Sequence, residues 1–441
     1  MGSMLRVKLG DVALVEISGV DKKTTEGEAS VRLCNFTDVY KNWAITSSMH
    51  DSFMVASANE REIAKFSLHR GQVAVTKDSE TRDDIGIPTY IADNFDDVIL
   101  GYHCALITPD ETQLNGKYLN AFLHTEFIHK FFSANASGSG QRYTLSIETL
   151  NSIPIYLPSL EEQERIGNIF SSIDRKIELN RQINDYLEAM ASQLYDYWFV
   201  QFDFPDKNGK PYKSSGGKMV WCNKLKREIP EGWMILSIND LATTCRGVSY
   251  DASQVSDTKT PKHDILVLRG NNIKNSHIVL DSNTAYISSS LVFPEQRIHR
   301  HDIIMTMSSG SKEHLGKCGM FQFDSQHTFG AFLTKFTPKK DYHYYVFSFL
   351  MSAWYKAKIK SICNGTGINN LTNENFNQVL LPVPPNQYIC LFNSTVSASF
   401  DRIGENEMQT EELSKQRDEL LPLLMNGQVS VKQLNNHLSH D

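Results

Sequence analysis

Apolar side chains recur at alternating spacings of three and four residues through two long segments, 159–200 and 385–427. This spacing places them on one face of an α-helix and is typical of the seam of a coiled coil. Each seam carries an asparagine at the same point, and a polar residue there costs stability but fixes register. The sequence therefore predicts that the two helices pack against each other. The residues expected to pair them are Ile173, Ile177, Asn180, Leu187, Leu194, Ile403, Asn406, Leu413 and Leu420.

The length of these helices requires a partner for each of them. A helix of about 40 residues is roughly 60 Å long, which is too long to be covered by one small domain. Because Ser399, Thr410 and Arg417 weaken the second seam, an arrangement of two separate helices on separate cores stays open. Pro422 is expected to kink or stop the second helix, and Gly427 is expected to cap it.

Each long helix follows about 150 residues in which short apolar runs alternate with Gly, Asn, Asp and Ser. This pattern predicts a strand-rich mixed domain that also holds one helical stretch. The clearest expected strands are 72–76, 98–108, 265–268 and 302–306, and the helical stretches are 119–132 and 344–362. The aromatic residues of these two stretches, interpreted as core, include Phe131, Phe132, Trp354 and Tyr355.

The second half of the chain repeats the first at an offset of about 226 to 230 residues. Leu145-Ser146, for example, matches Leu371-Thr372, and Pro158 matches Pro384. We therefore predict an α+β fold with two tandem mixed α/β domains, each followed by a long helix, in a pseudo-twofold arrangement. The expected boundaries are domain 1 (1–158), helix 1 (159–200), a connector (201–230), domain 2 (231–384), helix 2 (385–427) and a tail (428–441).

Composition narrows the class of protein. A net charge of −7 over 441 residues argues at first against a nucleic-acid binder, but the Gly-, Pro- and Lys-rich connector is basic, and base reading needs only local basic loops. The seven cysteines form no CxxC pair, which fits a reduced, cytoplasmic protein. No apolar run approaches the roughly 18 to 20 residues that span a bilayer, so no membrane role is expected.

Motifs for catalysis are missing from the sequence. It contains no G-x-x-x-x-G-K-[ST] phosphate loop and no complete dinucleotide fingerprint. It also lacks the Asn-Pro-Pro-aromatic segment expected of an adenine methyltransferase. His299 and His301 are expected on one side of a strand, but they lack a third ligand for a metal ion. We expect no active site and no metal site in this chain.

Four segments, 157–166, 176–184, 198–221 and 229–233, together with the duplication, carry a family resemblance. With them the chain resembles the specificity subunit of type I restriction-modification systems, which act in phage defence. The resemblance implies two target-recognition domains that each read one part of a split double-stranded DNA target, and an antiparallel coiled coil that spaces them. The second helix departs from the family pattern at 386–389.

The resemblance also implies partners. A non-catalytic chain of this kind docks modification (methyltransferase) subunits, expected as two copies, and restriction/translocase subunits. Adenine methylation would use S-adenosylmethionine, and translocation would use ATP and Mg, all bound by those partners and none by this chain. The target adenine would be flipped out of the duplex.

Residues that contact DNA are expected in matched loops of the two halves and, outside these, after the apolar run 265–268. Arg and Lys favour guanine edges and phosphates, whereas Asn and Gln favour adenine. An interpretation of these residues as ordinary solvated loop residues stays open. The candidates are Lys77, Thr81, Arg82, Gln141, Arg142, Arg269, Asn271, Ser311, Lys312, Asn369 and Asn370.

Two other classes of function compete with DNA reading. One is a self-contained DNA-modifying enzyme whose motifs have diverged, which would bind S-adenosylmethionine by itself. The other is a coiled-coil scaffold with no DNA role. The missing motifs count against the enzyme, and the two large loop-rich domains count against the scaffold.

Overall fold

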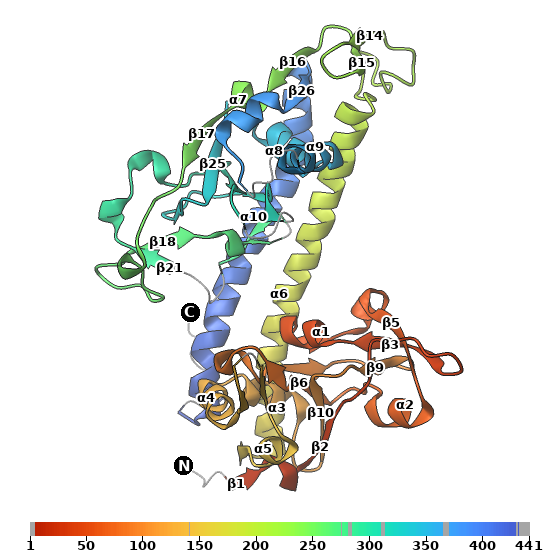
Figure 1. The fold of residues 1–441 in the computed structure, drawn as a ribbon, viewed down its shortest axis with the longest axis vertical. Coiled ribbons are helices and arrows are strands. Elements are labelled where there is room, and N and C mark those ends of the chain that lie inside the picture. Colours follow the sequence, from red (N-terminus) through yellow and green to blue (C-terminus); the bar gives the residue numbers. More distant parts are fainter. Residues whose placement is uncertain are drawn as a thin grey trace. The chain divides into compact units, whose positions relative to one another are not determined.

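The computed structural model describes residues 5–140, 142–274, 276–280, 285–309, 314–364, 370–428 and 431. The chain forms two compact units. The first unit comprises Met1–Leu179 and Glu412–Asp441, and the second comprises Asn180–Glu411. Each unit thus contains one strand-rich half of the chain and a segment of each long helix (Figure 1).

The first unit is built on three sheets and a strand pair, and one of the sheets has the order β11 (Ser137–Ser139), β12 (Arg142–Thr144) and β7 (Asp78–Ser79). Its five-stranded sheet has the order β2 (Ala13–Ile17), β10 (Cys104–Pro109), β6 (Val73–Thr76), β8 (Pro88–Ile91) and β4 (Ala44–Ile45). A three-stranded sheet has the order β5 (Met54–Ala58), β3 (Ala29–Cys34) and β9 (Val98–Leu100), and β1 (Leu5–Lys8) pairs with β13 (Pro154–Leu157). The helices are α1 (Phe36–Lys41), α2 (Glu60–Phe66), α3 (Gly116–Leu123), α4 (Glu126–Asn135) and α5 (Ile147–Asn151).

The second unit has the same plan. Its four-stranded sheet has the order β17 (Ala242–Arg246), β25 (Leu333–Pro338), β22 (Ile303–Thr306) and β23 (Cys318–Met320). A three-stranded sheet has the order β21 (Ala285–Ile287), β18 (Ile265–Leu268) and β24 (Thr328–Phe329), and β16 (Met234–Ser237) pairs with β26 (Leu380–Val383). The short strands β19 (Ile273–Lys274) and β20 (His277–Ile278) form a further pair, and the helices are α7 (Ile238–Leu241), α8 (His343–Met351) and α9 (Ala353–Asn364).

Strand directions match as well as strand order. In the first unit β3 is antiparallel to β5 and parallel to β9, and in the second β18 is antiparallel to β21 and parallel to β24. The register of the central strands is also repeated, since Cys104 faces Thr76 and Leu333 faces Thr306. The predicted tandem α+β fold is confirmed at the level of topology.

The long helices are α6 (Leu160–Tyr195), which continues into a π-helical turn at Asp196–Val200, and α10 (Asn386–Met425). In the second unit the rings of Tyr195 and Trp198 lie 6.2 and 6.0 Å from that of Phe392, and Asn184 contacts Asn406. The start of one helix therefore meets the end of the other, and the two run antiparallel there (Figure 1). In the first unit Phe170 of α6 and Leu424 of α10 belong to one hydrophobic core.

Two expected helices are each divided in two. The stretch 119–132 breaks between α3 and α4, where the Thr125 hydroxyl accepts the backbone N–H of Ile128 at 3.4 Å. The stretch 344–362 breaks between α8 and α9, where the Ser352 hydroxyl accepts the N–H of Tyr355 at 3.2 Å. In both units a hydroxyl side chain caps a new helix in the middle of an apolar periodic pattern. Of the aromatic residues placed in the core, Phe132 and Tyr355 are buried, whereas Phe131 is half-buried and Trp354 is partly exposed.

The connector 201–230 consists of turns up to residue 218 and an ordered hairpin after it. It contains the hairpin of β14 (Met219–Cys222) and β15 (Arg227–Pro230). Phe202 and Phe204 are buried, and the rings of both lie 5.3 Å from that of Trp233. Burial of these large rings orders a segment rich in Gly, Pro and Lys.

Two further expectations need correction. Helix α10 continues for one turn beyond Pro422, because a proline there removes only one hydrogen bond near the helix end. It ends at Met425, and Gly427 follows with φ +65°, with the N–H of Gln428 donating to the Leu423 carbonyl at 3.0 Å. His299 and His301 lie in the turn before β22 rather than on a strand, and the His301 ring stacks on that of His343 at 3.9 Å.

Candidate nucleic-acid interface

The first candidate surface forms where two distant loops of the first unit pair. Directly after β6 the chain forms β7 (Asp78–Ser79), which is hydrogen-bonded to β12 (Arg142–Thr144). The backbone N–H of Leu145 also donates to the Lys77 carbonyl at 2.8 Å. The candidates Lys77 and Arg142, from separate regions of the sequence, are thereby brought to one end of the central sheet.

The carboxylate of Asp78 organises this end of the sheet. Lys77 Nζ lies 3.0 Å, His103 Nδ1 2.5 Å and Arg142 Nη2 3.4 Å from Asp78 Oδ2. Burial acts to raise the pKa of Asp78, but hydrogen bonds from Thr144, His103 and Lys77 outweigh it and hold the pKa well below its ordinary value. The group is therefore ionised at neutral pH and holds two cations beside it.

Arg82 lies on the same loop, at the start of the short helix η3 (Arg82–Asp84). Its guanidinium carbon lies 5.1 Å from the centroid of the Tyr143 ring, a cation–π contact with β12. Thr81 and Arg82 are exposed. Three exposed candidates, Thr81, Arg82 and Arg142, thus surround one small strand pairing.

The second unit repeats this pairing of loops. Ser308 forms a β-bridge with Asn370, and its hydroxyl donates to the Asn370 side-chain oxygen. The N–H of Leu371 donates to the Met307 carbonyl at 2.7 Å, as that of Leu145 does to Lys77 in the first unit. Asn370 is exposed on this surface. The candidates Gln141, Ser311, Lys312 and Asn369 lie outside the described residues.

Arg269 and Asn271 come to the same end of the second unit. They flank the start of η6 (Gly270–Asn272), directly after β18, and the N–H of Arg269 donates to the side-chain oxygen of Asn272 at 2.8 Å. The neighbouring Leu268 carbonyl accepts the N–H of Gly330, in the loop before β25. Asn271 is exposed and Arg269 is partly exposed.

His103 is a site residue that the sequence analysis missed. The run 98–108 predicted one strand, but the structure divides it into β9 and β10 at residues 101–103, and His103 has φ +70°. A left-handed conformation is uncommon for histidine and here turns the ring onto Asp78. Gly101, just before it, was the available sequence signal for a break.

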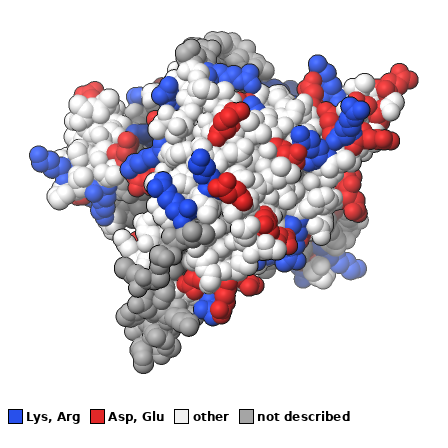
Figure 2. All heavy atoms as spheres, turned by 90° about the horizontal axis from the view of Figure 1, so that it is seen from below, with Lys and Arg blue, Asp and Glu red and all other residues white. Residues whose placement is uncertain are grey.

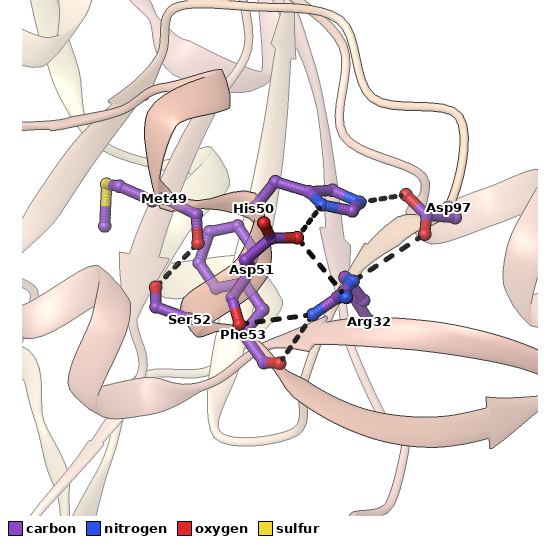
Figure 3. A network of polar contacts seen from close by, with 7 residues as sticks. All are labelled: Arg32, Met49, His50, Asp51, Ser52, Phe53 and Asp97. Atoms are coloured by element: carbon purple, nitrogen blue, oxygen red, sulfur yellow. Dashed lines mark hydrogen bonds and ion pairs between the residues drawn. The ribbon is translucent and has the colours of Figure 1, made fainter.

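A second polar network in the first unit has a structural role. Arg32 of β3 lies 3.4 Å from Asp51 and 4.0 Å from Asp97, and His50 Nε2 lies 2.9 Å from Asp97 (Figure 3). Hydrogen bonds to Asp51 and Asp97 raise the pKa of His50. The network fastens η2 (Ser47–Ser52) to β3, and it engages the Arg32 guanidinium with protein partners rather than leaving it for a ligand.

Charge and metal ligands add little to the picture. Figure 2 shows Lys and Arg interspersed with Asp and Glu on one face of the molecule, so that face carries no field of a single sign. Among the described residues, no group of three or more His, Cys, Asp and Glu is arranged to hold a metal ion.

Of the helices in the described part of the chain, none combines the length and apolar character that crossing a membrane requires.

The helix-pairing candidates face inward. Asn180, placed opposite Asn406 by the sequence, donates to the Gln409 side-chain oxygen at 3.0 Å and approaches the Asn406 carbonyl at 3.4 Å. The Asn406 side chain donates instead to Asn184, one turn further along α6. The candidates that are buried or half-buried are Ile173, Ile177, Asn180, Leu187, Leu194, Ile403, Asn406, Leu413 and Leu420.

Comparisons with known proteins single out one family. Residues 6–189 and 230–389 both match the type I restriction modification DNA specificity domain. The chain is 25% identical to the type I restriction enzyme MjaIX specificity subunit of Methanocaldococcus jannaschii over 72% of this chain and 70% of that protein. It is 30% identical to the EcoKI specificity subunit of Escherichia coli K12 over 48% of this chain and 47% of that protein. The crystal structure of the type-I restriction-modification S subunit from M. genitalium shares the fold, with a TM-score of 0.51, 13% identity and coverage of 96% of this chain and 97% of that one.

Proposed function

Since the chain belongs to the family of type I restriction-modification DNA specificity subunits, we infer that each of its two units reads one part of a split DNA target. One observation carries this inference: the same sheet order and the same pairing of loops occur twice in one chain. A duplicated reader suits a target in two parts, because each copy of the loop surface can meet its own base pairs.

The two loop surfaces differ in chemistry. In the first unit Lys77, Arg82 and Arg142 are cations suited to guanine edges and phosphates. In the second unit Asn271 and Asn370 offer amides, which suit adenine, and Arg269 adds a cation. We expect the two parts of the target to differ accordingly.

We propose that this chain performs no catalysis itself. The curated relatives that it matches are named as specificity subunits. Methylation would come from docked methyltransferase subunits that bind S-adenosylmethionine, and cleavage from restriction/translocase subunits that use ATP and Mg. The tandem repeat suits two methyltransferase copies, because each half of the chain can present an equivalent surface.

Helix pairing forms part of the same proposal. In the second unit Asn184 and Asn406 meet across α6 and α10, and polar contacts of this kind fix which residues face each other. We propose that the nine helix-pairing residues keep the register of α6 against α10.

Methylome sequencing tests the function directly. Cells that express the chain with its cognate methyltransferase subunit are compared with cells that lack only the chain. We expect adenine methylation on both strands of a split motif, present only when the chain is expressed. An undivided motif, or methylation that persists without the chain, would favour a self-contained enzyme or a scaffold.

A further inference from the structure

Phe332 presents a large apolar side chain to solvent at the candidate surface of the second unit. It is 70% exposed and lies in the short loop between β24 and β25. Exposed phenylalanines are unremarkable one by one, so the position of this one matters more than its exposure. That position is the end of the sheet at which Ser308 and Asn370 meet.

Backbone hydrogen bonds hold the Phe332 loop from two sides. The N–H groups of Met307 and Ser308 both point at the Phe332 carbonyl, at 2.9 and 3.3 Å. On the other side, Val248 donates to Phe329 at 2.7 Å and Gly330 donates to Leu268 at 2.9 Å. The loop is therefore fixed at its backbone while the Phe332 ring is left uncovered.

Close packing restrains the loop further. A Cβ atom on Gly247 would lie 2.2 Å from the Gly330 carbonyl oxygen, so only glycine allows these two segments to approach so closely. A side chain on so restrained a loop loses little backbone entropy when it meets a ligand.

The equivalent position in the first unit supports a role for Phe332 in contacting DNA bases. Phe332 lies directly before β25, and His103 lies directly before β10. The Phe332 carbonyl accepts the N–H of Met307, and the His103 carbonyl accepts the N–H of Lys77. Met307 and Lys77 each follow the central strand of their own sheet. His103 belongs to the cluster around Asp78 and Arg142. The two units therefore place different rings at one equivalent position, as expected of a position that sets specificity.

We propose that Phe332 contacts the C5-methyl group of a thymine in the part of the target that the second unit reads. This methyl group is the apolar feature of the major groove, and phenylalanine is among the side chains that contact it. Ser308 and Asn370 beside the loop supply hydrogen-bonding groups for the neighbouring base edges. The inference rests on the proposed reading of DNA by the second unit.

The test uses the full chain assembled with its methyltransferase subunits and a duplex that carries the target found by methylome sequencing. Each thymine of the target is replaced in turn by deoxyuridine, which lacks only the methyl group. Phe332→Ala is compared with Phe293→Ala, which removes a similarly exposed ring (65%) before the short helix η8 (Pro294–Gln296). Thermal unfolding of both variants checks that they are folded.

We expect one thymine at which deoxyuridine weakens binding of the unsubstituted complex by about 3- to 5-fold, as burial of one methyl group predicts. Phe332→Ala should weaken binding to the thymine duplex by about 10-fold and abolish the deoxyuridine effect at that position. Phe293→Ala should keep both the affinity and the effect.

Two results would overturn the inference. Unchanged affinity of folded Phe332→Ala would remove the residue from the interface. Weaker binding by Phe332→Ala with the deoxyuridine effect intact at every thymine would show a non-specific contact or a wedge between base steps. In either case chain-dependent methylation of a split motif would remain, so the proposed function would stand.

Discussion

The side-chain amide of Asn406 donates a hydrogen bond of 2.8 Å to the side-chain oxygen of Asn184, and both residues are buried between α6 and α10 in the second unit. The Asn184 amide in turn approaches the Ile403 carbonyl at 3.4 Å. A buried amide without a partner is costly, so any slip of one helix along the other would break these contacts. The pair fixes register at some cost in stability.

Substitution of Asn184 and Asn406 tests how the pair contributes to the stability of the fold. We expect Asn406→Leu alone to lower the free energy of unfolding by about 1 to 3 kcal/mol, because Asn184 is left buried without its partner. Asn184→Leu combined with Asn406→Leu should recover most of that loss, since two apolar residues can pack in the seam. Chemical denaturation monitored by circular dichroism measures both. A double variant less stable than Asn406→Leu would contradict this explanation.

His277 connects the strand pair β19–β20 of the second unit to both long helices. Its Nε2 lies 3.6 Å from Asp185 and from Glu188 of α6, and its Nδ1 lies 3.3 Å from Glu407 of α10. Burial acts to lower the pKa of His277, but the carboxylates of Glu407, Glu188 and Asp185 outweigh it and raise the pKa to about 9. The imidazolium is therefore favoured in the folded protein at neutral pH.

This arrangement predicts a pH dependence of stability. Because the folded pKa of His277 is raised, its contribution is fully present below the unfolded value of about 6.5 and is lost as pH rises through about 9. We expect the melting temperature to fall over this window and His277→Gln to flatten the fall. His299→Gln, a change at a more exposed histidine, is the matched control. Differential scanning calorimetry would contradict the prediction if His277→Gln and the unsubstituted chain lost stability equally.

Asp78 is expected to matter for specificity rather than for affinity. Asp78→Asn keeps the shape of the side chain but removes the charge that positions Arg142 and His103. We expect non-specific binding to strengthen because one negative charge is lost. Specific binding should weaken, so that the ratio of the two falls about 10-fold.

Competition binding at one fixed salt concentration measures that ratio. Asp110→Asn is the control. His103 lies directly before the start of β10, whereas Asp110 lies directly after its end, at the opposite end of the strand. An unchanged ratio in Asp78→Asn would show that the Asp78 cluster serves the fold alone.

Arg82 tests the first candidate surface most simply. Arg82→Ala should weaken target binding by about 1 to 3 kcal/mol if the guanidinium contacts a base edge. Arg61→Ala, at an exposed arginine of α2, should change it by less than about 0.5 kcal/mol. Fluorescence anisotropy with a labelled duplex measures both variants. Equal effects of the two substitutions would show that Arg82 contributes only non-specific electrostatic attraction to DNA.

The sequence predicted those parts of the fold in which local pattern and burial agree. The strands β6, β18 and β22 are continuous buried apolar runs, and they appear almost where the pattern placed them. The helix breaks at Thr125 and Ser352 were missed, because one hydroxyl cap outweighed an unbroken apolar periodicity.

The candidate site was harder to predict, because it depends on contacts distant in sequence. Asp78 and Arg142 are 64 residues apart and meet only through the pairing of β7 with β12. Nothing local in the sequence marks Asp78 as the buried centre of a cation cluster, or His103 and Phe332 as equivalent positions. Those relationships emerge only from the repeated register of the two sheets.

The central claim is that each unit reads its own part of the target, and paired methylome sequencing of Arg142→Ala and Asn370→Ala tests it most directly. Each variant is expressed with the same methyltransferase subunit in cells that lack the native chain. We predict that Arg142→Ala relaxes base preference in one part of the split motif only, and that Asn370→Ala relaxes it in the other part only. Relaxation of the same part by both variants, or of both parts by either one, would contradict the claim.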